Sequence, residues 1–231
     1  MKKALTIRFG ALNYKYLLIV LIVLVWLPVS NSFAVKTTAV QTLDTGETLH
    51  LVFMREEEKL ARDVYLTLGE VYPENQQFKS IDGSEQRHFD TMKEKLDQYT
   101  IEDPNTDTSI GIYTGDDFGW YFTEKFNALV DRGQANELEA LYAGAFIEEI
   151  DMHDIVHCPE VIVESENGVG EDECGLDYTD EKPLQKSYTN LLEGSKDHLR
   201  AYVNAIEKEI GTGNYVAQVL TQEEVDSILG R

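Results

Sequence analysis

The 231-residue sequence predicts an all-α protein built as a bundle of four long helices. Four long stretches repeat apolar residues at three- and four-residue steps, which is the period of an amphipathic helix. No stretch shows the two-residue alternation of a half-buried strand, and the chain has no internal repeat. Helical stretches joined by shorter polar segments are the pattern of an all-α bundle.

The first 34 residues have the composition of a secretory signal peptide. Four basic residues and no acidic residue precede an apolar run over residues 16–29, and residues 32–34 form a small-x-small cleavage site ending at Ala34. The apolar run has 14 residues, against the roughly 20 that a membrane-spanning helix needs. We therefore expect a secreted or periplasmic protein without stable membrane insertion. An uncleaved signal that anchors the chain is the alternative.

Residues 35–44 are polar and lack periodicity, so we expect a flexible lead-in before the bundle. The formal net charge is −22, and removal of the predicted signal would leave 16 basic and 42 acidic residues, a charge of −26. Phosphate binding relies on basic patches. The composition therefore excludes nucleic acid as an expected partner.

The first two helices are expected on either side of Pro73. The first begins between residues 45 and 48 and ends near Tyr72, because it contains strong helix formers and no Pro. The second begins at Ser80 or Asp82 and ends near Tyr99. A Gly-containing loop over residues 101–122 follows, and its aromatic residues are expected to pack over one end of the core.

The second half of the chain has the same organisation. After a short helix over residues 123–131, the third long helix spans residues 136–157 and the fourth spans residues 183–211. These helices complete a bundle domain over residues 45–211. The C-terminal segment 212–231 contains a short helix that begins with a capping box formed by Thr221 and Glu224.

Cys158 and Cys174 are the only cysteines, and they flank the acidic loop over residues 158–182. Two cysteines 16 residues apart in an exported protein are expected to form a disulfide. A redox-active pair is disfavoured because the C-x-x-C spacing is absent. The loop itself is expected to be a solvated insertion.

Each long helix places an acid or a histidine on its apolar face. In the first helix Glu58 follows the apolar register, although Glu57 lies closer to the centre of the apolar arc. In the second helix Glu85 and His88 are three residues apart, which puts a carboxylate beside an imidazole.

In the third helix Glu148 lies at the centre of the apolar face, and Asp151 lies at its flank. The fourth helix places His198 among apolar residues. His153 and His157 point to the opposite side of the third helix, so we expect them to be surface or packing residues despite their four-residue spacing.

Four inward carboxylates repel one another and have raised pKa values unless cations neutralise them. The alternative is a set of salt-bridged or hydrogen-bonded core residues, but the inward faces offer almost no Lys or Arg for that role. Two divalent cations would supply the missing charge and coordinate the oxygens directly. The pattern therefore favours a site for two metal ions.

These motifs resemble those of ferritin-like di-iron carboxylate proteins, including rubrerythrin. Such proteins carry a first-helix Glu followed by Ala and Tyr, as Glu58, Ala61 and Tyr65 do, and a Glu-x-x-His on the second helix, as Glu85 and His88 do. More closely, four segments between Leu49 and Tyr202 resemble an uncharacterised ferritin-like domain family: residues 54–65, 84–88, 144–155 and 194–202.

The chain departs from that pattern in two places. Ferritin-like proteins usually carry a second Glu-x-x-His on the fourth helix, but Ser195 stands three residues before His198. If Asp151 replaces the missing Glu, the candidate ligands are four carboxylates and two histidines, the usual number for two metals. If it does not, only one metal is expected to bind well. The choice of Glu58 over Glu57 comes from the resemblance.

The resemblance implies a ferritin-like bundle with two iron ions, or manganese as the alternative. The implied ligands are Glu58, Glu85, His88, Glu148, Asp151 and His198. Tyr65 is implied to be a hydrogen-bond partner near Glu58. The expected activity is that of an oxidoreductase acting on peroxide, O₂ or Fe²⁺.

A peroxidase-like reaction would need an external electron donor, whereas a manganese-catalase-like reaction would not. The alternative function is non-catalytic: an exported binding or structural module whose metal is structural or absent. The sequence leaves the oligomeric state open.

Overall fold

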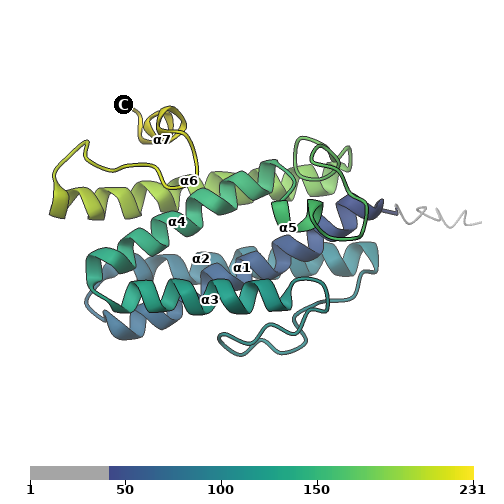
Figure 1. Cartoon of the computed structure of the whole chain (residues 1–231), viewed down its shortest axis with the longest axis horizontal. Coiled ribbons are helices and arrows are strands. Elements are labelled where there is room, and N and C mark those ends of the chain that lie inside the picture. The colour runs from purple at the N-terminus through teal and green to yellow at the C-terminus, as the bar shows by residue number, and fades with distance from the viewer. Residues whose placement is uncertain (1–41) are drawn as a thin grey trace, which may run out of the picture. The chain divides into compact units, whose positions relative to one another are not determined.

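The computed structural model describes residues 42–231, so the predicted signal peptide and most of the lead-in lie outside the described residues. Within this range every regular element is a helix (Figure 1). The long helices are α1 (Thr45–Val71), α2 (Gln76–Tyr99), α4 (Glu137–Val156) and α6 (Lys182–Ile210). The others are α3 (Gly119–Gln134), α5 (Glu160–Val163) and α7 (Gln222–Leu229). The prediction of an all-α helical bundle is confirmed.

Four helices surround the centre of the bundle. α1 packs against α2, and α4 packs against α6; α2 also contacts α6, and α1 contacts α4. The helices are amphipathic along these contacts, so their apolar stripes are removed from water together. α6 is continuous from Lys182 to Ile210, through Gly194.

α2 begins four residues earlier than the earliest predicted start. The side chain of Asn75 accepts a hydrogen bond from the Gln77 backbone N–H at 3.0 Å and so caps the helix. The helix ends at Tyr99, and the next residue, Thr100, adopts a left-handed conformation with φ of 60°. The early start was missed because the first turn contains no apolar residue before Phe78.

α3 is longer than the predicted segment 123–131, and it belongs to the core. The ring centroid of Phe53 on α1 lies 5.4 Å from that of Phe118, the residue that caps α3, and 5.0 Å from that of Phe122. α3 contacts both α1 and α4. It is therefore a fifth packing helix, which covers one side of the four-helix arrangement (Figure 1).

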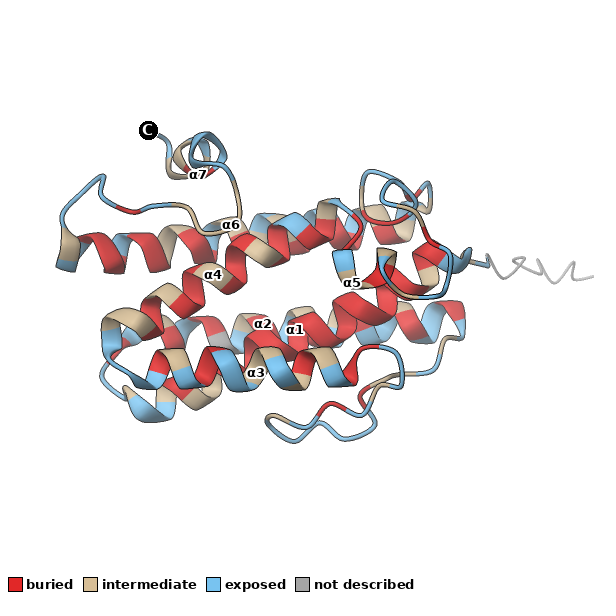
Figure 2. Cartoon of the chain, viewed as in Figure 1, coloured by how far each residue is buried: buried red, intermediate tan, exposed pale blue. Residues whose placement is uncertain are grey.

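α1 is buried on every side, and not along one stripe as predicted. Residues 49–65 are all buried, and the ribbon of α1 is red over most of its length in Figure 2. The loop over residues 100–118 covers the charged side of the helix. Its backbone oxygens at Ser109 and Thr108 accept hydrogen bonds from Lys59 at 2.8 Å and Arg62 at 2.9 Å. This loop thus lies along α1, whereas the sequence suggested that it covers one end of the core.

The disulfide between Cys158 and Cys174 is formed, with an S–S distance of 2.05 Å. The loop that it closes is less solvated than predicted, because Ile162 and Val169 are buried. The segment that follows Cys174 also contacts α1: the Thr179 hydroxyl donates to the Glu47 carboxylate at 2.5 Å. The acidic loop is therefore packed against the start of the first helix.

The C-terminal segment is attached to α4 through Glu149. One oxygen of this buried carboxylate accepts hydrogen bonds from three consecutive backbone N–H groups, those of Gln218, Val219 and Leu220, at 2.6 to 3.0 Å. The other oxygen accepts the Tyr215 hydroxyl at 2.6 Å. Glu149 is thus an inward acid with a complete set of partners inside the protein.

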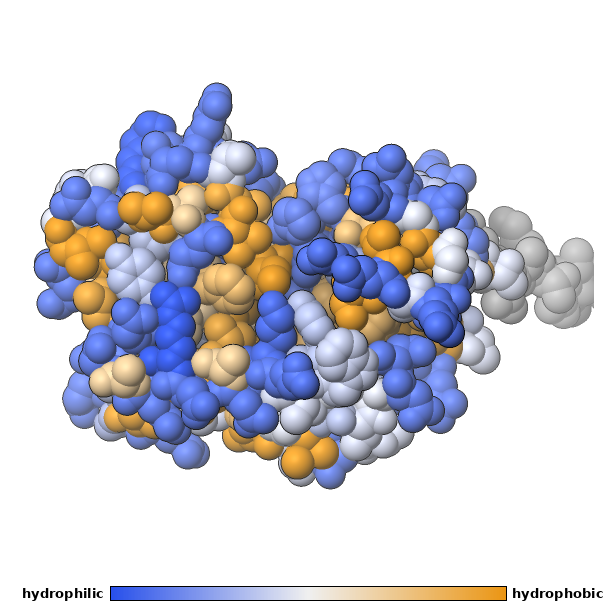
Figure 3. All heavy atoms as spheres, in the orientation of Figure 1, coloured by the Kyte–Doolittle hydropathy of each residue, from blue (hydrophilic) through white to orange (hydrophobic). Residues whose placement is uncertain are grey.

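Hydrophilic residues cover most of the face seen in Figure 3, and hydrophobic residues appear there in small separate groups. Among residues 42–231, no helix combines the length and the apolar character needed to cross a bilayer.

Candidate metal centre

Two groups of potential metal ligands lie at the centre of the bundle. The first group consists of Glu58 on α1 with Glu85 and His88 on α2, and the second consists of Glu85, Glu148 on α4 and His198 on α6. In each group the candidate ligand atoms lie within 4.8 Å of one another. Because Glu85 belongs to both groups, they form one cluster with a shared carboxylate.

The two imidazoles present the same nitrogen to this cluster. His88 Nδ1 lies 3.2 Å from Glu85 Oε2 and 3.4 Å from Glu58 Oε2. His198 Nδ1 lies 2.7 Å from Glu85 Oε1 and 3.4 Å from Glu148 Oε2. The ring centroids are 5.7 Å apart and the planes are tilted by 32°. Each oxygen of Glu85 therefore faces one imidazole.

The carboxylates are almost sealed from solvent, and some of their atoms lack partners. The side chains of Glu58, Glu85 and Glu148 are 1 to 3% exposed, whereas those of His88 and His198 are 14% and 11% exposed. Within the described residues, Glu58 Oε1 and Glu85 Oε1 accept no hydrogen bond. The 2.7 Å approach of His198 Nδ1 to Glu85 Oε1 lacks hydrogen-bond geometry. Buried polar atoms that face one another without bonding are expected where a cation belongs.

The electrostatics of the cluster follow from burial and from the facing charges. Burial raises the pKa of Glu58 and Glu148, and nearby carboxylates add to this effect. Burial would also raise the pKa of Glu85, but its contacts with His198 and His88 lower it. The same carboxylates raise the pKa of both histidines against the opposing effect of burial. Without metal, imidazolium protons therefore carry the positive charge of the cluster.

Tyr65 holds Glu148, although the resemblance placed it near Glu58. Its hydroxyl donates to Glu148 Oε1 at 2.6 Å. This bond leaves Glu148 Oε2 facing His198. The fully buried phenol, whose pKa is raised by burial and then by Glu148, remains protonated and orients the carboxylate.

Asp151 lies beside the cluster but belongs to neither group of ligands. It accepts a hydrogen bond at 2.5 Å from Ser195, the residue that stands where the family pattern has Glu. Its Oδ1 atom is buried and has no hydrogen-bond partner among the described residues. Burial, and then the charge of Glu58, raise the pKa of Asp151. The Ser195–Asp151 pair thus puts a carboxylate of α4 beside the position where α6 lacks one.

Glu57, the alternative to Glu58, belongs to neither of the two ligand groups. It is buried, and its pKa is raised first by burial and then by the charge of Asp154. The imidazole of His88 approaches Glu58 instead. The structure therefore favours Glu58 as the α1 member of the cluster, although the two residues are adjacent in sequence.

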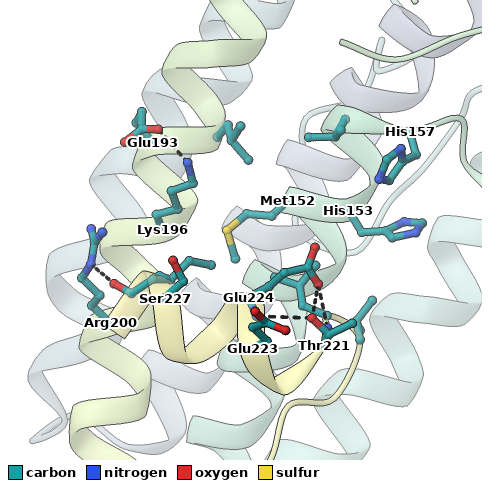
Figure 4. Close-up of a pocket in the computed structure, with 15 residues that line it drawn as sticks. Met152, His153, His157, Glu193, Lys196, Arg200, Thr221, Glu223, Glu224 and Ser227 are labelled. Atoms are coloured by element: carbon teal, nitrogen blue, oxygen red, sulfur yellow. Dashed lines mark hydrogen bonds and ion pairs between the residues drawn. The ribbon is translucent and has the colours of Figure 1, made fainter. Parts of the chain in front are cut away.

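His153 and His157 are exposed, as expected. They line a pocket of about 830 Å³ between α4, α6 and the C-terminal segment with α7 (Figure 4). In Figure 4 both imidazoles lie across the pocket from Lys196 and Arg200. None of the predicted metal ligands lines this pocket.

A second set of buried charges on α1, separate from the two ligand groups, was not expected from the sequence. Arg55 pairs with Asp103, and both Lys59 and Arg62 pair with Asp63. These cations are inward-facing, but their charges are already compensated away from the metal cluster. The i, i+4 spacing of Lys59 and Asp63 indicated a pair, but nothing local indicated that a distant loop would bury it.

The comparisons with known proteins place the chain in a family. Residues 47–231 match the model of a family described as an uncharacterized protein domain, DUF2202. The chain belongs to this family. The DUF2202 match covers both ligand groups, the disulfide loop and the C-terminal segment.

One relative of this DUF2202 chain is the uncharacterized protein MJ0754 of Methanocaldococcus jannaschii. The two are 36% identical over 189 residues, which cover 82% of this chain and 89% of the relative. The crystal structure of hypothetical protein MJ0754 is similar to this fold, with a TM-score of 0.68 over 83% of this chain and 95% of that chain. Neither description states a function.

Proposed function

We propose that this protein is an exported, ferritin-like metalloprotein that binds two metal ions, iron or alternatively manganese, and acts as an oxidoreductase on peroxide, O₂ or Fe²⁺. The observation that carries the proposal is the sharing of Glu85 by two groups of buried ligands. Ferritin-like di-metal proteins build their sites from Glu and Glu-x-x-His residues that project inward from four helices. Here the ligand groups also come from four helices, α1, α2, α4 and α6.

The donor set fits iron or manganese. Carboxylate oxygens and imidazole nitrogens suit these metals, whereas structural zinc sites favour thiolate ligands. Both cysteines are held in the disulfide, so neither offers a thiolate. Glu58, Glu85 and His88 would hold one ion, and Glu85, Glu148 and His198 would hold the other. Asp151 would complete a set of four carboxylates and two histidines by moving toward the cluster.

Bound iron would supply one-electron redox chemistry between its +2 and +3 states. The protein's own contribution is to orient ligands and to exclude water. Tyr65 fixes one oxygen of Glu148 and leaves the other free to bind. The 1 to 3% exposure of the three glutamates keeps the cluster dry. A dry cluster strengthens the attraction between cations and carboxylates.

The reaction partners would be small molecules. The pocket of about 830 Å³ lies away from the cluster, because none of the ligands lines it. With both cysteines in a disulfide, a reductive reaction would need an external electron donor, and a catalase-like reaction with manganese would not. The disulfide also supports export, because such bonds persist in oxidising compartments.

A second candidate, a structural bundle that needs no metal, is favoured by one observation. The two imidazolium groups can neutralise the cluster without any ion, because the carboxylates raise their pKa and they in turn lower the pKa of Glu85. In that case the cluster would be a hydrogen-bonded core network.

Loading the purified mature protein with iron or manganese separates these candidates. We expect the loaded protein to consume H₂O₂, or to oxidise Fe²⁺ in air, faster than the same concentration of free metal. Glu85→Gln should abolish this rate, and Glu94→Gln, on the exposed side of the same helix, should not. A protein that turns over nothing and melts at the same temperature with and without added metal would favour the structural candidate.

A further inference from the structure

The backbone of α6 touches the imidazole of His88 at Gly194. A Cβ atom at this position would lie 2.7 Å from His88 Cε1 and 2.8 Å from Nε2. Ordinary van der Waals contact begins near 3.4 Å, so the ring leaves no space for a methyl group. Glycine weakens the interior of a helix relative to alanine. Here it allows α6 and the ring to come together.

The nitrogen next to Cε1 in the same ring faces the metal cluster. His88 Nδ1 lies 3.2 Å from Glu85 and 3.4 Å from Glu58. Neighbouring atoms of the ring therefore meet the α6 backbone and two carboxylates. Any side chain at position 194 would displace the ring, and with it the nitrogen that faces the carboxylates.

The second ligand group, formed by Glu85, Glu148 and His198, does not include the ring that Gly194 contacts. His198 belongs to α6 itself, and its Nδ1 faces Glu85 and Glu148 from the other side of the cluster. The other glycine with a crowded position near the centre, Gly144, faces the ring of Tyr202 and not an imidazole. A change at Gly194 would therefore act on one half of the cluster.

We propose that Gly194 is a positioning residue for His88, and that it determines whether the site formed by Glu58, Glu85 and His88 can bind its metal ion. This inference rests on the proposed metal-binding function. It adds that one methyl group at position 194 would weaken metal binding at the site that includes His88 and not at the site that includes His198.

The first test is a titration of the metal-free mature protein with Co²⁺ under anaerobic conditions. The visible absorption of the bound Co²⁺ measures binding. The wild-type protein should bind two ions per chain. Gly194→Ala should keep one ion and bind the other about 10- to 100-fold more weakly, as changes that disturb ligand orientation do. Gly83→Ala is the matched control, because it lies in the interior of α2 and a Cβ there meets nothing within 4 Å. Two ions bound with wild-type affinity by Gly194→Ala would overturn the proposal.

The second test needs no metal. The thermal unfolding of the metal-free wild-type protein is compared with that of Gly194→Ala, His88→Ala and the double variant. If the added methyl group competes with the His88 ring, the fall in Tm caused by Gly194→Ala should disappear in the His88→Ala background. The same fall in both backgrounds would overturn the proposal. A wild-type protein that binds no Co²⁺ would refute the metal-binding function, while this cycle would still report on the contact between Gly194 and His88.

Discussion

At the scale of single residues, Glu85 connects the two halves of the cluster. One of its oxygens faces His88 and the other faces His198, and these rings come from different helices. No other residue is a member of both ligand groups in the described chain. Its place on the apolar face of α2 was visible in the sequence because Ile81 and Met92 lie one and two helical turns away on the same face. Its bridging position was not visible, because it depends on how α6 packs against α2.

The choice between Glu57 and Glu58 shows where periodicity stops being informative. Adjacent helical residues differ by 100° around the axis, and both side chains are buried because α1 has no solvent-facing side. In a helix that is buried on every side, the apolar periodicity does not show which of two adjacent residues faces the cluster. The position of His88 on the neighbouring helix makes the distinction.

His50 is a residue-scale feature that the sequence did not reveal. Its Nε2–H donates to the Asp154 carbonyl at 2.8 Å, so its Nδ1 accepts the Tyr188 hydroxyl at 3.0 Å. The ring is fully buried, and this burial lowers its pKa from 6.5 to about 4. Protonation therefore favours the unfolded chain. The stability contributed by neutral His50 is complete above pH 6.5 and is lost as the pH falls toward 4.

We predict that the free energy of unfolding of the wild-type protein falls by about 3 kcal/mol more than that of His50→Gln between pH 7 and pH 4. Gln does not titrate, so the difference between the two proteins isolates this histidine from all other groups. Urea unfolding at several pH values measures it. Parallel stability curves for the two proteins would show that His50 is not held neutral by the fold.

At the scale of elements, α1 is the helix whose environment the sequence described least well. Its charged side, with Arg55, Lys59 and Arg62, has the composition of a solvent-facing surface. The loop over residues 100–118 covers this side and supplies Asp103 and backbone carbonyls. Local periodicity predicts which side of a helix is apolar, but it contains no information about a distant loop that buries the polar side.

The pair Lys59–Asp63 should therefore differ strongly from a surface pair with the same spacing. Asp63 is fully buried and accepts from Lys59 at 2.5 Å and from Arg62 at 2.6 Å. Asp63→Asn would leave two buried cations without a counter-charge, so we expect it to lower the free energy of unfolding by about 3–5 kcal/mol.

Asp97→Asn is the matched control, because Asp97 pairs with Lys93 at the same i, i+4 spacing while both side chains are exposed, by 65% and 47%. We expect it to cost no more than about 0.5 kcal/mol. Chemical denaturation of both variants gives the comparison. Equal effects would mean that the loop does not bury α1 in solution.

The boundaries of the other elements show what local signals can provide. The capping box of Thr221 and Glu224 predicted the start of α7 correctly, because both bonds lie within four residues. α3 was predicted too short, since its first turn carries no side-chain cap. Its packing against Phe53 involves residues far away in the sequence.

At the scale of the whole molecule, the all-α bundle could be predicted because each long helix has its own apolar period. The arrangement of these helices brings residues up to 140 positions apart into one cluster, from Glu58 to His198. The sequence suggested that they meet, since buried carboxylates need compensation. It could not show that Asp151 bonds Ser195 and stays outside both ligand groups.

The most direct test of the central claim is the metal content of the mature protein, purified without chelators from cells supplied with iron and manganese and measured by mass spectrometry. Two ions per chain in the wild-type protein, and almost none in Glu85→Gln, are the predicted results. A wild-type protein without metal, or equal metal content in both proteins, would contradict a shared carboxylate between two metal sites.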